Sequence, residues 1–198
     1  MCTLEMIELP KNINLNEIPY KHFFAQYHIS AELDQSILNW LRNDAPWILV
    51  EKDFYTQYEF SFLDIETPTY LNFIKSSLFL DKLKKFMEKS YNVQLQSKFS
   101  VVAHKLVKGH VIKIHNDYLE DDSIRESHRL LLHFNRDWSD YDGGYCMIFA
   151  NDNPNSLHEI IAPNNFLLQS FAISENSHHA VSEVKNSERF TIIFTFYK

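Results

Sequence analysis

Eight short apolar or alternating runs follow one another between residues 93 and 197: VQLQSKFSVVAHKLV (93–107), HVIKIHNDY (110–118), HRLLLHF (128–134), GYCMIFA (144–150), HEIIA (158–162), FLLQSFAI (166–173), HHAVSEV (178–184) and RFTIIFTFY (189–197). Turn residues separate the runs. Runs of this length are typical of strands, and a series of short strands predicts a mainly β sandwich or barrel.

The first half of the chain has helical periodicity instead. SAELDQSILNWLRND (30–44) places apolar residues at helical spacing behind a capping serine, and TPTYLNFIKSSLFLDKLKKFMEKSYN (67–92) repeats this spacing with a proline near its start. Between them, PWILVEKDFYTQYEF (46–60) is β-branched and aromatic enough for one or two strands. We expect a single domain, 1–198, in which a helical and strand support region (1–92) braces the β core (93–198).

The composition excludes several classes of protein. The net charge is −7 and the chain has no run of five or six Lys and Arg residues, so we expect no nucleic-acid partner. No apolar run is long enough to span a membrane and the first twenty residues lack an export signal, so we expect a cytoplasmic protein without membrane association. Only three glycines occur, which predicts that each has a positive φ or a close backbone approach.

A candidate metal site begins at the end of the second run. His115 and Asp117 are two residues apart, and in a strand this spacing directs both side chains to the same side. With ten histidines in the chain, one such pair is weak by itself and is compatible with a purely structural role.

Two residues near the end of the chain extend this pattern. His179 opens another apolar run and offers a third ligand, which completes the two-histidine, one-carboxylate set of non-haem Fe(II) oxygenases. A zinc site is less favoured, because neither a four-ligand cysteine set nor an HExxH helix is present. Arg189 lies in an apolar strand and requires an anion, either an internal carboxylate or a dicarboxylate ligand, and Thr191 on the same face adds a hydroxyl donor.

The segment from about residue 106 to residue 197 resembles the catalytic core of the 2-oxoglutarate- and Fe(II)-dependent dioxygenases, in particular the prolyl 4-hydroxylase-like branch. That branch has a glycine six residues before HxD, then Y-L-N-x-x-W, a glycine pair, H-x-V, and an arginine ten residues after the last histidine. The chain supplies the matching residues in this order: Gly109, His115 and Asp117, His133-Phe134-Asn135 with Trp138, Gly143-Gly144, His179-Ala180-Val181, and Arg189.

The resemblance implies a double-stranded β-helix (jelly-roll, cupin-like) core and a role for each matching residue. His115, Asp117 and His179 would bind Fe(II), with His178 as the weaker alternative to His179, and Arg189 would bind the C5 carboxylate of 2-oxoglutarate. O2 would be the second co-substrate, and ascorbate is a candidate reductant.

The chain departs from the family pattern at two positions. His133 replaces the tyrosine that often helps at the co-substrate carboxylate, so it is either a substitute donor there or a buried core histidine. Leu106 replaces the tyrosine three residues before the glycine, which leaves the contact to the C1 carboxylate without a residue, and His104 is the neighbouring candidate for it.

The resemblance further implies an enzyme that hydroxylates an unactivated carbon and releases succinate and CO2. We expect the substrate to be a side chain in a peptide or protein, because DFYTQYEF (53–60) and HKLVKGHVIKIHNDY (104–118) resemble bacterial members associated with peptide maturation. The alternatives are a hydroxylase of a free amino acid or small metabolite, and a non-catalytic cupin-like ligand-binding protein. The charged loop 120–126 is either a substrate lid or a solvated connection.

Overall fold

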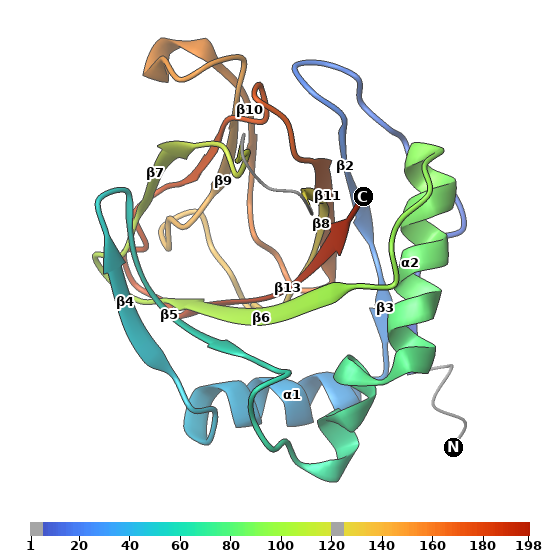
Figure 1. The fold of residues 1–198 in the computed structure, drawn as a ribbon. Coiled ribbons are helices and arrows are strands. Elements are labelled where there is room, and N and C mark those ends of the chain that lie inside the picture. The colour runs from blue at the N-terminus through green and yellow to red at the C-terminus, as the bar shows by residue number, and fades with distance from the viewer. Residues whose placement is uncertain (1–5, 120–124) are drawn as a thin grey trace.

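The computed structural model describes residues 6–119 and 125–198, and its main feature is a strongly curled antiparallel sheet (Figure 1). Each of the eight predicted runs overlaps a strand of this sheet: β6 (Phe99–Leu106), β7 (Ile112–His115), β8 (Glu126–His133), β9 (Cys146–Phe149), β10 (Leu157–Ile161), β11 (Leu167–Ala172), β12 (His179–Val181) and β13 (Arg189–Tyr197). The predicted mainly β core is confirmed.

The strand order defines two faces that enclose a central space. One face contains β10-β9-β12-β7 and the other contains β5-β6-β13-β8-β11-β2, where β5 spans Tyr55–Ser61 and β2 spans His22–Gln26. The two faces meet where Tyr55 of β5 pairs with Ile112 of β7, and β4 (Ile48–Lys52) pairs with β5 outside this path. This topology is the jelly roll that the family resemblance implies.

The last strand shows how the sequence separates the inside of the curl from the outside. Every residue of β13 is buried, because both faces of the strand are covered. Phe190, Ile192, Phe194 and Phe196 belong to the main apolar core, which includes residues of both helices. The alternate residues from Arg189 to Thr195 line a cavity. The period of two therefore divides a core-forming face from a ligand-binding face.

Two helices cover the outer face of the larger sheet (Figure 1). The first, α1 (Ala31–Asn43), starts at its predicted cap, where the Ser30 hydroxyl accepts a hydrogen bond from the backbone of Leu33. The predicted helix over 67–92 is wrong as a single helix. It is a 3-10 helix, η2 (Thr69–Lys75), followed by α2 (Ser77–Tyr91), because Ser76 is extended and caps α2 through its side chain.

The structure also contains elements that the sequence reading did not predict. β2 forms one edge of the large sheet by pairing with β11, and β1 (Ile7–Glu8) pairs with β3 (His28–Ile29). A short 3-10 helix, η3 (Pro154–Ser156), precedes β10. The three glycines have positive φ values of 87°, 69° and 63°, as predicted. Within the described ranges, no helix has the length and apolar character needed to cross a membrane.

Candidate active site

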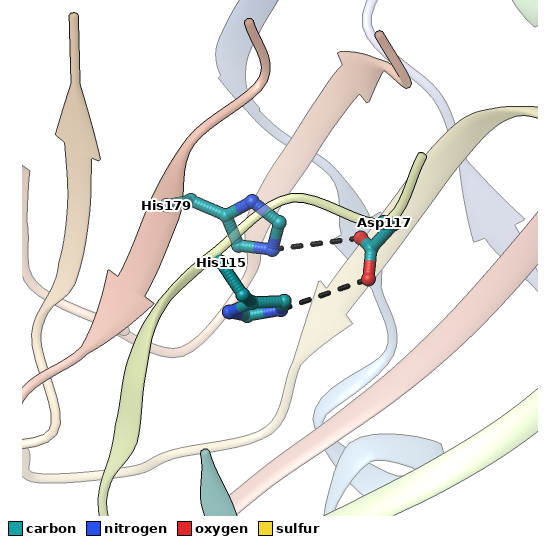
Figure 2. Close-up of side chains that lie close together, drawn as sticks. All are labelled: His115, Asp117 and His179. Atoms are coloured by element: carbon teal, nitrogen blue, oxygen red, sulfur yellow. Dashed lines mark ion pairs between the residues drawn. The ribbon is translucent and has the colours of Figure 1, made fainter. Parts of the chain in front are cut away.

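The three predicted metal ligands converge inside the curl (Figure 2). His115 ends β7, Asp117 follows two residues later, and His179 opens β12, where it pairs directly with His115. The three ligand atoms lie within 4.8 Å of one another. Nε2 of His115 lies 3.6 Å from Oδ1 of Asp117, and Nε2 of His179 lies 3.6 Å from Oδ2.

The backbone sets the tautomer of both imidazoles. Nδ1 of His115 lies 2.9 Å from the carbonyl oxygen of Lys113, and Nδ1 of His179 lies 2.8 Å from that of Ser177. A carbonyl oxygen only accepts hydrogen bonds, so each Nδ1 carries the proton and each Nε2 keeps its lone pair. Two lone pairs and a carboxylate therefore face one another without a proton between them, which is a donor set that a divalent cation satisfies.

The charge states at neutral pH agree with this reading. Burial lowers the pKa of His179 to about 4, so the imidazole is neutral. Burial alone would raise the pKa of Asp117, but Arg129 and the two imidazoles hold it well below its usual range. A neutral His179 and an ionised Asp117, with the Nε2 of His115 beside them, fit the facial set of a non-haem iron site. The alternative ligand, His178, lies outside this cluster.

A cavity of about 340 Å³ adjoins the three ligands and has Arg189 in its wall. Arg189 is 3% exposed, and burial lowers its pKa to about 10. Its Nε is buried without a hydrogen-bond partner. Within residues 6–119 and 125–198 no carboxylate forms an ion pair with it, so the internal salt bridge considered from the sequence is not found there. An unpaired buried guanidinium suits an anionic ligand, and Thr191 lines the same cavity.

His133 does not line the cavity itself but belongs to a hydrogen-bonded chain behind its wall. Nε2 of Gln169 donates to Sγ of Cys146 (3.0 Å), which directs the amide oxygen of Gln169 towards Nε2 of His133 (3.3 Å). The hydroxyl of Thr191 lies 3.4 Å from the other ring nitrogen, Nδ1. His133 thus supports Gln169 and Thr191, and its pKa is lowered well below its usual value, mainly by burial.

The sequence reading missed Gln169 and Cys146, although both line the cavity. A signal for Gln169 was present, because it is a long polar residue inside the apolar run FLLQSFAI. Cys146 carried no such signal, since a thiol in GYCMIFA is equally consistent with a small core residue.

Of the two positions considered for the C1 carboxylate contact, the predicted His104 lies at the cavity and Leu106, which replaces the family's tyrosine, does not. His104 lines the cavity, with Nε2 3.3 Å from Gln57 and 3.9 Å from Glu59. Burial, with Arg129 and Arg189 nearby, lowers the pKa of His104 to about 3, so it is neutral. Leu106 is fully buried in a separate apolar cluster and does not line the cavity.

An aromatic ring lies against each of the two candidate histidine ligands. The Phe54 ring centroid lies 4.8 Å from that of His115, and the Phe171 centroid lies 4.7 Å from that of His179. The two rings give the wall an apolar part next to the candidate ligands. Of the loop considered as a lid, residues 120–124 lie outside the described residues, while Glu126 contributes to the cavity wall.

A jelly roll that carries two histidines and one carboxylate inside its curl defines the class of non-haem iron oxygenases. Comparison with protein families places the chain more narrowly, because residues 101–196 match the 2OG-Fe(II) oxygenase superfamily. This match assigns residues 101–196 to the superfamily and supports a 2-oxoglutarate-dependent dioxygenase, and the fold of the chain is that of solved prolyl 4-hydroxylases. No curated protein matches it in sequence.

Several solved structures share the fold at low sequence identity. A prolyl-4-hydroxylase from Pseudomonas putida is 18% identical, with a TM-score of 0.71 over 88% of this chain and 91% of that one. A prolyl hydroxylase from Trichoplax adhaerens, solved with a hypoxia-inducible-factor peptide fragment, is 13% identical, with a TM-score of 0.69 over 89% and 83%. A viral collagen prolyl hydroxylase from Paramecium Bursaria Chlorella virus-1, solved with 2OG, is 14% identical, with a TM-score of 0.63 over 89% and 95%.

Proposed function

We propose that this dioxygenase hydroxylates an unactivated carbon of a side chain in a peptide or protein, with succinate and CO2 as co-products. The observation that carries the proposal is the convergence of the two Nε2 lone pairs and the Asp117 carboxylate beside a cavity that contains the unpaired Arg189. Bound iron, together with 2-oxoglutarate and O2, supplies the oxidising chemistry, for which ascorbate is a candidate reductant. The protein supplies binding, orientation and a shielded space.

Each residue has a defined task in this proposal. His115, Asp117 and His179 hold Fe(II), and the Nδ1 hydrogen bonds to the backbone keep both imidazoles oriented towards it. Arg189 binds the C5 carboxylate of 2-oxoglutarate through a charge-assisted pair, assisted by Thr191. Gln169 faces the same cavity and is held by His133, so His133 acts on the co-substrate through Gln169.

The size of the cavity limits how much of a substrate can enter it. At about 340 Å³ it is at the small end of ligand sites, so a co-substrate leaves room for one side chain and not for a large molecule. The peptide fragment solved with the Trichoplax adhaerens enzyme, and the prolyl hydroxylases among the similar structures, support a peptide or protein. Localisation in the cytoplasm and the single-domain organisation remain part of this proposal.

The iron assignment is tested by anaerobic titration with Fe(II) and 2-oxoglutarate. The wild type should develop the weak visible charge-transfer band of this chelate, and His179→Ala should abolish it. His178→Ala is the matched control, because it removes the adjacent imidazole and should leave the band unchanged. An unchanged band in His179→Ala would refute the assignment.

The substrate class is tested by mass spectrometry of candidate peptides incubated with the enzyme. We expect a gain of one oxygen that requires both Fe(II) and 2-oxoglutarate. Hydroxylation of free amino acids without any of peptides would overturn the peptide proposal and leave the dioxygenase intact. Desaturation or cyclisation would appear instead as a loss of two hydrogens.

A further inference from the structure

A second guanidinium, that of Arg129, faces the cavity beside the metal ligands. Arg129 lies on β8, and its side chain is 22% exposed. Its Nη1 lies 3.1 Å from Oδ2 of Asp117, and its Nη2 donates to Oε2 of Glu126 at 3.1 Å. The cavity therefore contains two arginines, Arg189 and Arg129, and the second one contacts a candidate iron ligand.

The hydrogen-bonding capacity of Arg129 is only partly used. Its Nε is buried without a hydrogen-bond partner. Oδ2 of Asp117 is also buried without one, so the 3.1 Å contact between the two side chains is an ion pair that lacks hydrogen-bond alignment. Within the described residues, the guanidinium of Arg129 therefore donates its hydrogen bond to Glu126 and not to Asp117. A buried guanidinium nitrogen that has no acceptor is costly unless an anion meets it.

When a metal ion occupies the iron site, Arg129 has a stronger electrostatic need for an anion beside it. The carboxylate of Asp117 then serves a divalent cation, so Arg129 faces a positively charged centre across this shared carboxylate. Like charges in a poorly solvated cavity repel strongly. An anion that lies next to both the metal and Arg129 removes this conflict.

The strand register adds neutral donors at the same place. Arg129 pairs with Thr195 of β13, and Thr195 pairs with Ser100 of β6, so the three residues form one row across the sheet. All three line the cavity. The row that contains His104 crosses β13 at Thr191 instead, four residues closer to Arg189.

From this juxtaposition we propose that Arg129 binds the C1 carboxylate of 2-oxoglutarate, the one next to the keto group, while Arg189 binds the C5 carboxylate. The inference rests on the proposed function. The co-substrate is a dianion, and the cavity provides one arginine for each carboxylate. Arg129 thereby takes the role for which the sequence suggested His104, which is neutral and faces Gln57 and Glu59.

The test measures binding without turnover, using protein loaded with Mn(II) as a redox-inert substitute for iron. The two probes are 2-oxoglutarate and 2-oxopentanoate, which keeps the C1 carboxylate and the keto group but lacks the far carboxylate. Calorimetry measures the first probe, and water-proton relaxation of the bound Mn(II) measures the second at millimolar concentrations. Arg129→Gln should weaken both probes by tenfold or more, since a charge-assisted hydrogen bond contributes about 1.5–3 kcal/mol.

Three variants serve as matched comparisons. Arg189→Gln should weaken 2-oxoglutarate by tenfold or more and leave 2-oxopentanoate within twofold. Arg129→Lys keeps the charge and should recover part of the affinity for both probes. Arg42→Gln, at the exposed end of α1, should change neither.

The outcomes separate this inference from the proposed function. If the wild type fails to bind 2-oxoglutarate, the proposed function itself fails. If Arg189→Gln loses 2-oxoglutarate but Arg129→Gln binds both probes like the wild type, only the role of Arg129 is refuted. If Arg129→Gln loses only affinity for Mn(II), the proposed role of Arg129 is also refuted, because Arg129 would then orient Asp117. If it changes only the Michaelis constant of the peptide, the role is refuted as well, because Arg129 would then bind the primary substrate.

Discussion

Adding one methyl group at Gly144 should damage both the stability of the fold and the binding of the co-substrate. Gly144 has a φ of +63°, which side chains with a Cβ rarely adopt. A Cβ built there would lie 2.9 Å from Cζ2 of Trp138 and 3.2 Å from Cδ of Arg189. The side-chain stem of Arg189 must therefore move to accept the substitution.

The size of the effect follows from two contributions. The left-handed conformation costs a residue with a Cβ about 1–2 kcal/mol. Overpacking of a well-filled site costs about 1–3 kcal/mol more, so Gly144→Ala should lose roughly 2–5 kcal/mol. Gly109 is the matched control, because its φ is +87° but a Cβ would meet nothing within 4 Å. Gly109→Ala should therefore lose only about 1–2 kcal/mol.

Thermal unfolding and calorimetry measure the two effects separately. For a chain of this size, each kcal/mol corresponds to about 2–4 °C in Tm, so Gly144→Ala should melt roughly 4–20 °C below the wild type. Its affinity for 2-oxoglutarate should fall about tenfold, because small displacements of a binding group weaken its contacts. Gly109→Ala should bind 2-oxoglutarate normally. Equal melting temperatures and equal affinities in the two variants would refute the reasoning.

Three further predictions concern other parts of the fold. Asp34→Ala should lower the free energy of unfolding by about 3 kcal/mol in urea titrations, because Asp34 is fully buried and accepts a 2.6 Å hydrogen bond from Arg136. Burial, with smaller contributions from Lys198 and Lys21, lowers the pKa of His128 from 6.5 to about 4, so the unfolded chain binds this proton more readily than the folded one. The free energy of unfolding should therefore fall by about 3 kcal/mol as the pH drops through this window, and His128→Gln should lose that part of the acid sensitivity. His133→Phe should reduce the affinity for 2-oxoglutarate by several-fold with unchanged Mn(II) affinity, because it leaves the amide oxygen of Gln169 without its partner; unchanged calorimetric titrations would contradict this.

Much of the fold could be predicted because its signals are local. The β-branched and aromatic residues between turns predict the strands of the eight runs, and the capping residue Ser30 predicts the start of α1. The break at Ser76 could not be predicted in the same way. The helical spacing of the apolar residues continues across this position, while the extended backbone there is decided by packing of η2 and α2 on the sheet.

The residues of the candidate site also fall into those that local sequence signals predict and those that they do not. His115, Asp117, His179 and Arg189 are recognisable because their spacing along the chain is itself the pattern, and the structure brings them to one cavity. Gln169 and Arg129 have no such spacing. They reach the cavity only because β8 pairs with β11 on one side and with β13 on the other, and these pairings join residues far apart in the chain.

The sequence by itself determined the eight strands from β6 to β13, the candidate ligands and the positions where glycine is needed, since each of these depends on neighbouring residues and on the period of two in a strand. Only the tertiary structure decided which face of each strand lines the cavity and which residues of neighbouring strands lie next to each other there. It placed His133 behind the cavity wall and Arg129 beside Asp117. The physical reason is that long-range strand pairing sets these positions, and such pairing leaves no mark in the local order of residues.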